Sequence, residues 1–395
     1  MIRIGRRSFL GGATAAATAL GIAPLRAQAA TQVPPAGAKP APRSAGVARP
    51  SPSEQAAMDA VASGFRQQNG IPGLSVAVAQ AGVPVYVRTF GVSNNQGGVP
   101  LQPTDVFRIA GISKSVTATA IFTLVEQRRL GLNDLVFGGP NPILGAQAGG
   151  PMVAQITIDN LLTQTAGGWD AGPNDPMFMN TRMPPAELIS WTLQNVPLQN
   201  PPGSTFAVSN FGYCVLGRVI ERVTGSPYAS YVQQSVLSRC GINTMRIGGA
   251  TLSQRFPDEV IYYGQPGEKP IPYEIPLNRM DADDGWLASP SDLVAFASHL
   301  NRFPSRLNIL KPQTTVQMTT GSPANPAYGR GWEVSRDGTF WHHGALPGTT
   351  GILVHARNGI CWAALANTHQ PNGSLDTGID QMMWQLVRQV RAWRL

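Results

Sequence analysis

A lysine at the start of a helix is the residue of this chain best suited to act as a base. Lys114 lies three residues after Gly111 and opens a run in which apolar residues recur at helical spacing as far as Leu130. Gly131 follows that run, where a helix is expected to stop. The helix dipole and apolar surroundings both disfavour the charged form of a lysine at such a place. We therefore expect a central buried helix with a basic amine in its first turns.

The residues around Lys114 resemble a known active site. The stretch from Phe107 to Ala118 is similar to the active-site helix of serine β-lactamases and penicillin-binding proteins, particularly the class C-like branch with its esterases, D-amino-acid peptidases and acyltransferases. The signature of that family is Ser-x-x-Lys, in which the serine is the acylated nucleophile. Here the matching residues are Gly111-Ile112-Ser113-Lys114. Glycine, which has no side chain to acylate, stands at the nucleophile position.

Further segments resemble motifs of the same family and follow in the family's order. Residues 156–168 resemble its Leu-Leu-Thr-His-Thr-Ser-Gly segment, with Gln164 where histidine is usual. The other matching segments are residues 202–225, which hold the second motif, residues 284–293, which resemble a Gly-Gly-Leu-x-Ser-x-x-Asp-Leu helix start, residues 328–332, and the turn Pro347-Gly348. Together the matches span about residues 72–367, most of the chain.

Acyl-enzyme chemistry requires a hydroxyl nucleophile, a base, a proton shuttle and N–H donors for the oxyanion. In the family's second motif, Tyr-x-Asn, Val208 replaces the tyrosine that relays the proton, whereas Asn210 is retained. The resemblance implies that Asn210 bonds to Lys114 or to an amide of the ligand. The base would remain, but the nucleophile and the shuttle would be missing.

The third motif often has the form His-x-Gly in this branch and matches His342-His343-Gly344. The resemblance implies that His342 is a retained motif position and that Gly344 lets a ligand run along the edge strand. It also implies that the N–H of Ala345 is a donor for the oxyanion. Trp286 is a further candidate for the wall of a ligand pocket.

Structural roles are the alternatives for these residues. Lys114 could be held by Asn210 and backbone carbonyls, and His342 could face solvent from a strand. Trp286 could fill the core as easily as line a pocket.

Two serines lie close to the empty nucleophile position. Ser113 is adjacent to Lys114 but points to a different face of the helix from Gly111. Ser115 lies on the same side as Gly111 but one turn deeper, where a carbonyl group could hardly reach it. Replacement of the nucleophile by either serine is the less favoured hypothesis.

Alternating apolar patterns at both ends of the chain predict one antiparallel sheet. Near the N-terminus, residues 73–79 and 83–90 alternate on either side of the Ala81-Gly82 turn. Near the C-terminus, Asp337-Gly338 and Asn358-Gly359 are strong hairpin turns. Strands are expected there at residues 331–336, 339–343, 350–357 and 359–367, and amphipathic helices at residues 53–68, started by Ser53, and 376–392.

The segment between the two groups of strands is predicted to be mainly helical. We expect an α/β fold of the α+β type, in which an antiparallel sheet flanked by helices is joined to a mainly helical subdomain. The sheet lobe would comprise about residues 53–104 and 301–395, and the helical lobe about residues 105–300. This matches the two-lobed β-lactamase/transpeptidase architecture that the resemblance implies, with the active site between the lobes.

Residues 1–29 have the features of a twin-arginine signal peptide. Arg6-Arg7-Ser8-Phe9-Leu10 is a twin-arginine pattern, a weakly apolar run follows, and Ala27-Gln28-Ala29 is a small-residue cleavage site. Residues 30–52 are rich in Pro and Ala without periodicity, which is typical of a linker. We expect a β-lactamase-like domain at residues 53–395 that works in the periplasm or outside the cell.

Composition argues against a nucleic-acid partner and against a metal site. The formal net charge of +8 falls to +4 without the four arginines of residues 1–29, and the remaining basic residues are scattered, which argues against nucleic acid. Cys214, Cys240 and Cys361 are far apart and are expected to be buried thiols. His342 and His343 should point to opposite faces of a strand. No metal, cofactor or membrane span is expected, and the oligomeric state is left open.

Three hypotheses follow for the function. The first is an exported protein of this fold whose acyl-transfer chemistry is lost or altered and whose cleft binds an ester, amide or peptide-like small molecule. The second is an active esterase, β-lactamase, D-peptidase or acyltransferase that uses Ser113, Ser115 or Lys114 itself. The third is non-hydrolytic chemistry with Lys114 and His342 as acid and base.

Overall fold

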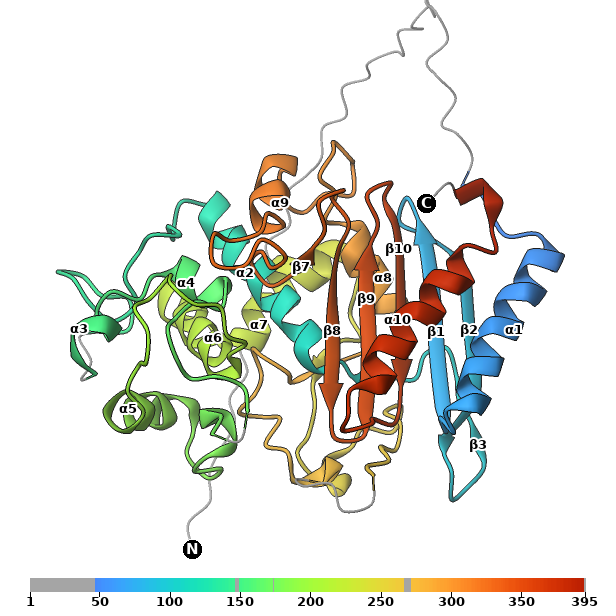
Figure 1. Ribbon diagram of the computed structural model, residues 1–395, viewed down its shortest axis with the longest axis horizontal. Coiled ribbons are helices and arrows are strands. Elements are labelled where there is room, and N and C mark those ends of the chain that lie inside the picture. Colours follow the sequence, from blue (N-terminus) through green and yellow to red (C-terminus); the bar gives the residue numbers. More distant parts are fainter. Residues whose placement is uncertain (1–46, 146–148, 173, 266–270, 394–395) are drawn as a thin grey trace, which may run out of the picture. The chain divides into compact units, whose positions relative to one another are not determined.

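Seven antiparallel strands form the central sheet, in the order β3-β2-β1-β10-β9-β8-β7 (Figure 1). A computed structural model describes residues 47–145, 149–172, 174–265 and 271–393. The expected signal peptide and residues 30–46 lie outside the described residues. The strands of this sheet are β1 Gly73–Gln80, β2 Val83–Asn94, β3 Val99–Pro100, β7 Glu333–Val334, β8 Phe340–Leu346, β9 Thr349–His355 and β10 Ile360–Ala366.

Strands from the two ends of the chain are adjacent in this sheet, which confirms the expected fold class. β1 pairs with β10, so that Leu74 lies opposite Ala366, and β10 continues to β9 and β8 through antiparallel pairing. The turns at Gly338 and Gly359 have φ angles of +93° and +82°, which glycine adopts without strain. The strand expected at residues 331–336 is reduced to β7, which has only two residues.

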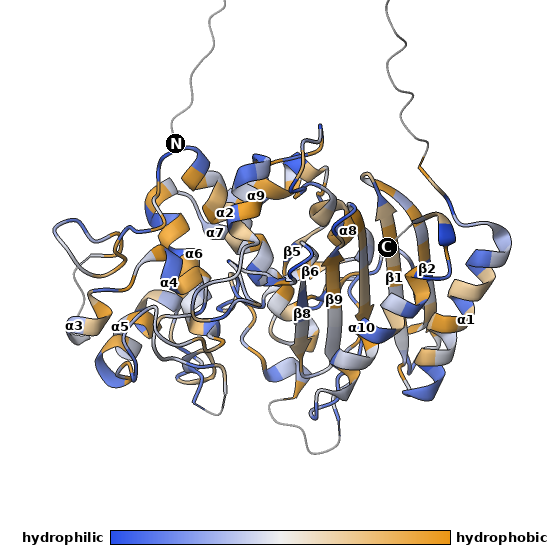
Figure 2. Cartoon of the chain, turned by 45° about the horizontal axis from the view of Figure 1, so that its top comes forward, coloured by the Kyte–Doolittle hydropathy of each residue, from blue (hydrophilic) through white to orange (hydrophobic). Residues whose placement is uncertain are grey.

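Two helices cover one face of the sheet. α1 Pro52–Gln68 and α10 Ser374–Val387 bury their apolar sides against β1, β9 and β10. Figure 2 shows hydrophilic and hydrophobic residues mixed along both helices, as expected for helices with one buried side. Ser51 caps α1 instead of the expected Ser53, because Glu54 completes a capping box with Ser51 and Pro52 fits the first turn.

The opposite face is covered by the middle of the chain. α2 Ser113–Glu126 follows the short strand β4 Phe107–Arg108 and the 3₁₀ turn η1 Ala110–Ile112, and twelve of its fourteen residues are buried. The expected central buried helix is therefore present, although it ends before Gly131. α8 Pro290–Ser298, which was expected in the helical lobe, packs instead against β1 and β10.

The remaining elements surround α2. β4 pairs with β6 Trp286–Ala288, which also pairs with β5 Arg246–Ile247, in a second small sheet. The other helices are α3 Gly150–Val153, α4 Ile158–Leu162, α5 Pro185–Asn195, α6 Asn210–Thr224, α7 Tyr228–Val232 and α9 Pro312–Met318. Shorter helical turns are η2 Pro176–Phe178, η3 Gln233–Leu237, η4 Ser238–Cys240, η5 Leu252–Gln254, η6 Pro272–Glu274 and η7 Arg391–Trp393.

One apolar core joins the two expected lobes. It extends from Ala77 and Leu353 of the sheet to Val116 of α2 and Val215 of α6. The described residues form one compact unit. The three cysteines are buried free thiols, as predicted. None of the described helices is both long and apolar enough to cross a lipid bilayer.

Gly331 and Gly225 provide a matched test of the packing around α2. Both have positive φ angles, +76° and +73°. A methyl group on Gly331 would lie 2.5 Å from Cβ of Ala118 and 2.9 Å from the carbonyl oxygen of Lys114, whereas one on Gly225 would have nothing within 4 Å. Gly225→Ala should cost about 1–2 kcal/mol from backbone strain, and Gly331→Ala about 1–3 kcal/mol more. Urea unfolding would measure the loss of stability in both variants. Equal losses would contradict this packing.

Candidate active site

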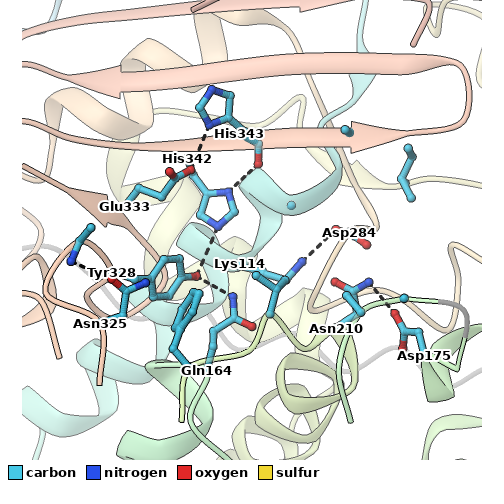
Figure 3. A pocket seen from close by; sticks show the side chains of 18 of the residues that line it. Lys114, Gln164, Asp175, Asn210, Asp284, Asn325, Tyr328, Glu333, His342 and His343 are labelled. Atoms are coloured by element: carbon cyan, nitrogen blue, oxygen red, sulfur yellow. Dashed lines mark hydrogen bonds and ion pairs between the residues drawn. The ribbon is translucent and has the colours of Figure 1, made fainter. Parts of the chain in front are cut away.

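A cavity of about 650 Å³ lies beside the first turn of α2 (Figure 3). Its walls come from the start of α2, residues 171–172 and 175–178, the segments 206–210 and 325–333, and one edge of β8. β8 pairs with β7 only at Phe340 and Trp341, so the strand is open on that side from His342 onward. Lys114, Asn210 and His342, the retained motif positions, all line this cavity.

Gly111 lines the cavity opposite the third motif. A methyl group on Gly111 would lie 3.2 Å from Cε1 of His342 and 3.0 Å from the carbonyl oxygen of His343. The position at which the family carries its nucleophile therefore faces His342. This is expected if Gly111 belongs to the first motif and His342 to the third. No side-chain atom is present there to carry an acyl group.

Lys114 is held by a buried carboxylate. Its Nζ lies 3.1 Å from Oδ1 of Asp284 and also donates to the carbonyl oxygen of Asp283 at 3.4 Å. The side chains of Lys114 and Asp284 are only 3% and 5% exposed. Asn210, the expected partner of Lys114, instead donates from Nδ2 to Oδ2 of Asp175 at 2.8 Å. The base of the family mechanism is thus paired with an acid that the sequence analysis did not select.

The carboxyl groups of Asp175, Asp283 and Asp284 interact electrostatically in the region of Lys114. Burial raises the pKa of Asp175 to about 6, against the hydrogen bonds from the N–H of Met177 and from Asn210. Burial and the neighbouring Asp284 charge raise the pKa of Asp283 well above its usual value. Neither carboxyl oxygen of Asp283 has a hydrogen-bond partner among the described residues. Asp175 and Asp284 line this end of the cavity, and Asp283 is buried next to Asp284.

Arg279 fixes the segment that carries Asp175. Its guanidinium donates to the carbonyl oxygens of four residues in that part of the chain: Met177, Met179, Asn180 and Met183. Arg279 precedes Asp283 and Asp284 by a few residues, so one guanidinium group ties both acidic segments together. The position of the carboxyl groups is therefore built into the fold.

His342 ends a chain of hydrogen bonds with a defined direction. Nε2 of Gln164 donates to the hydroxyl of Tyr328 at 2.9 Å, and that hydroxyl lies 3.4 Å from Nε2 of His342. Nδ1 of His342 lies 2.5 Å from the carbonyl oxygen of His343, which can only accept. The imidazole therefore carries its proton on Nδ1. Burial lowers the pKa of His342 to about 4, so the ring is neutral near pH 7.

His343 forms an ion pair at the rim of the cavity. Its Nδ1 lies 3.0 Å from Oε1 of Glu333. Burial opposes protonation of His343, but the hydrogen bond and the charge of Glu333 raise the pKa of His343 above its usual value. The pKa values of the two neighbouring histidines are thus shifted in opposite directions, and Figure 3 shows their rings pointing in different directions.

The other expected site residues have varied positions. Val208 is 44% exposed and lines the cavity, as does Ala345. Trp286 does not reach the cavity; it is buried in β6, and its indole N–H donates to the hydroxyl of Tyr228 at 3.0 Å. Gly344 is also absent from the wall. A methyl group there would lie 2.1 Å from the carbonyl oxygen of Ile109, so this glycine allows the sheet to approach η1 closely.

Both neighbouring serines are turned away from the cavity. Oγ of Ser113 accepts a hydrogen bond from the N–H of Trp286 at 3.3 Å. Oγ of Ser115 donates to the carbonyl oxygen of Gly331 at 2.7 Å. Both residues are fully buried, and neither lines the cavity. Among the described residues, no group of three or more His, Cys, Asp or Glu side chains is placed to hold a metal ion.

Comparison with known proteins shows the family to which the chain belongs. The family model described as "Beta-lactamase" matches residues 58–383. The chain belongs to the beta-lactamase family. Among curated relatives of the family, Protein flp of Staphylococcus aureus is 26% identical over 318 residues, which cover 76% of this chain and 60% of that protein. The putative penicillin-binding protein PbpX of Bacillus subtilis is 23% identical and covers 83% of this chain and 78% of its own.

Solved structures share the fold of this chain. The D-amino acid amidase of Ochrobactrum anthropi SV3, complexed with L-phenylalanine amide, has a TM-score of 0.71 and 21% identity, and covers 87% of this chain and 100% of its own. The octameric penicillin-binding protein homologue from Pyrococcus abyssi has a TM-score of 0.66 and 24% identity, and covers 83% of this chain and 77% of its own. At this identity the likeness concerns the fold. The chain also spans only 60% of the length of the Staphylococcus relative.

Sequence reasoning missed the acidic half of the site. Asp283 and Asp284 lie at the edge of a recognised motif, and the run Asp281-Ala282-Asp283-Asp284 holds three acids in four residues directly before a buried strand. That run was an available signal. Asp175 had none, because it lies in a segment without a family motif. Glu333 and Tyr328 were seen only as parts of a strand and a motif.

Proposed function

We propose that this protein is an exported member of the beta-lactamase family that binds a small ester, amide or peptide-like ligand without forming an acyl-enzyme. The observation that carries the proposal is the composition of the cavity wall. Among the described residues that line it there is no serine, threonine or cysteine. The only hydroxyl group on those residues belongs to Tyr328, which is held between Gln164 and His342.

An active hydrolase with a substitute nucleophile is less well supported. Ser113 and Ser115 would each have to leave a buried hydrogen bond before reaching a substrate. Lys114 would have to leave Asp284 to act as a nucleophile or as a base. Loss of the serine nucleophile alone reduces kcat by about a million-fold in a serine protease, which leaves only binding and oxyanion assistance.

The two ends of the cavity suggest the chemistry of the ligand. Asp175 and Asp284 form an acidic end, which favours a ligand with an amine. Phe178, Phe206 and Leu346 supply apolar surface in the same cavity. An amino-acid amide combines an ammonium group with an apolar side chain, and the related amidase structure holds L-phenylalanine amide. Ligands of this kind are the class that we propose for this cavity.

Ester turnover tests the proposal. The purified protein is expected to hydrolyse p-nitrophenyl acetate no faster than the same protein after heat denaturation, because the cavity wall holds no nucleophile that is free to react. Hydrolysis well above that background, lost in Lys114→Ala while its circular dichroism spectrum is retained, would favour the hydrolase alternative. The export part of the proposal rests on the twin-arginine pattern at residues 6–10.

A further inference from the structure

A second cavity, of about 270 Å³, lies on the other side of β8 from the candidate active site. It is lined by Trp341 of β8, Val354 of β9, the turn 335–339, and Asp380 and Trp384 of α10. Trp341 and His342 are consecutive residues of a strand, so their side chains point to opposite faces of the sheet. Figure 1 shows α10 lying across this part of the sheet. The cavity is therefore separate from the site described above.

Two indole rings form walls of this cavity. Trp341 and Trp384 are both half-buried. The ring of Trp384 meets that of Trp362 edge to face, at 4.8 Å between centroids, and this contact fixes its orientation. The guanidinium carbon of Arg388 lies 5.3 Å from the centroid of Trp384. One indole of the cavity thus already contacts a cation through its ring.

A carboxylate without an ion-pair partner lies beside the indoles. Asp380 is half-buried, and no basic side chain among the described residues lies within 4.0 Å of its oxygens. Burial raises the pKa of Asp380, and the side chains of His343 and Trp384 oppose that rise. Glu333 is the other charged group that acts on it. The wall of the cavity therefore includes a carboxyl group with which no basic side chain among the described residues forms an ion pair.

The polar groups of the turn are bonded to one another. Asp337 accepts hydrogen bonds from the hydroxyl of Ser335 and from the N–H of Thr339. The same Ser335 hydroxyl also bonds to the carbonyl oxygen of Thr339, and the hydroxyl of Thr339 bonds to Asp337. The turn consequently offers a ligand little hydrogen bonding of its own. The faces of the indole rings and the carboxyl group of Asp380 remain to contact a ligand.

We propose that this cavity binds a small quaternary ammonium head group. A cation is attracted to the faces of tryptophan rings and to an unpaired carboxylate. A fully methylated ammonium group has no N–H to satisfy, which suits a wall whose polar groups are already bonded. Pockets for small molecules usually measure about 300–1,000 Å³. A cavity of about 270 Å³ therefore fits a head group better than a larger ligand.

Ligand-observed NMR with choline chloride tests the proposal on the whole protein. The methyl protons of choline should shift upfield and saturate, because they would lie against indole rings. The neutral alcohol in which carbon replaces the nitrogen of choline should bind about fivefold more weakly or worse. Asp380→Asn and Trp341→Leu should each weaken choline binding, whereas Asp376→Asn, one turn earlier in α10 and outside the cavity wall, should not.

A second arm of the experiment tests whether the head group comes from a lipid or from a free small molecule. Sedimentation with vesicles of phosphatidylcholine, compared with vesicles of phosphatidylglycerol, would distinguish a lipid head group from free choline. Binding in either arm that is lost in Asp380→Asn supports the proposal. Equal binding of choline and its neutral analogue, full binding by Asp380→Asn and Trp341→Leu, or the absence of saturable binding in both arms would overturn it. Circular dichroism would verify that each variant is folded.

Discussion

Lys114→Met is expected to lower the free energy of unfolding by about 3–5 kcal/mol near neutral pH, the range found when one partner of a buried ion pair is removed. Asp284 would then be left 5% exposed and without its cation. The carboxyl group of Asp175, which the charge of Asp284 already affects, adds to the repulsion. Urea unfolding, followed by circular dichroism at pH 7, measures the loss.

A double variant separates the ion pair from simple packing. Lys114→Met combined with Asp284→Leu removes both charges and should recover much of the stability, because apolar replacement of a buried pair is often neutral. The difference between the loss of stability in the double variant and the sum of the losses in Lys114→Met and Asp284→Leu measures the coupling between the two residues. A loss below about 1 kcal/mol in Lys114→Met, which is the usual value for an exposed pair, would show that Lys114 does not hold this cluster together.

Asp175→Asn is expected to stabilise the protein at pH 8 by as much as about 3 kcal/mol, because burial raises the pKa of Asp175 from 3.8 to about 6, and each pKa unit corresponds to about 1.4 kcal/mol. The folded state binds its proton more tightly than the unfolded state does. The contribution of Asp175 to stability is therefore fully present below about pH 3.8 and is lost as the pH rises through about 6. Asparagine carries no charge and avoids this loss.

Unfolding free energies measured at pH 4 and at pH 8 test the direction of this effect. Wild type and Asp175→Asn should have similar unfolding free energies near pH 4 and diverge as the pH rises through 6. The side chain of Asn210 can rotate its amide by a half turn and still bond to the new asparagine. Asp170→Asn, at an exposed carboxyl nearby, is the matched control and should show no such divergence. An Asp175→Asn variant that is less stable than wild type at pH 8 would refute the assignment.

The local parts of the fold follow from the sequence because their causes are local. Alternation in residues 73–79 and 83–90 and the Asn358-Gly359 turn determine hairpins within short stretches of chain. The register Gly111-Ile112-Ser113-Lys114 places the glycine and the lysine on one side of a helix start. In the structure Gly111 faces His342, and both residues line the cavity with Lys114.

The partners of the site residues depend on contacts between distant segments. Asp284 is 170 residues away from Lys114, and the resemblance to the family pointed to Asn210 instead. Asp175 reaches the cavity because Arg279 binds the carbonyl oxygens of its segment, which no local pattern reveals. Trp286 was expected at the site but lies elsewhere. A large aromatic residue in a motif suggested a pocket wall, but its indole fills the core beside Tyr228.

The central claim is that the atom that should carry an acyl group is absent from this cavity. Intact-mass spectrometry after incubation with a fluorescent penicillin or a fluorophosphonate probe tests it directly, with an active serine enzyme treated in parallel. The protein is expected to keep its unmodified mass, since Gly111 has no hydroxyl group and Ser113 and Ser115 are buried in hydrogen bonds. A mass increase of one probe molecule, mapped to a serine by peptide sequencing, would contradict the account.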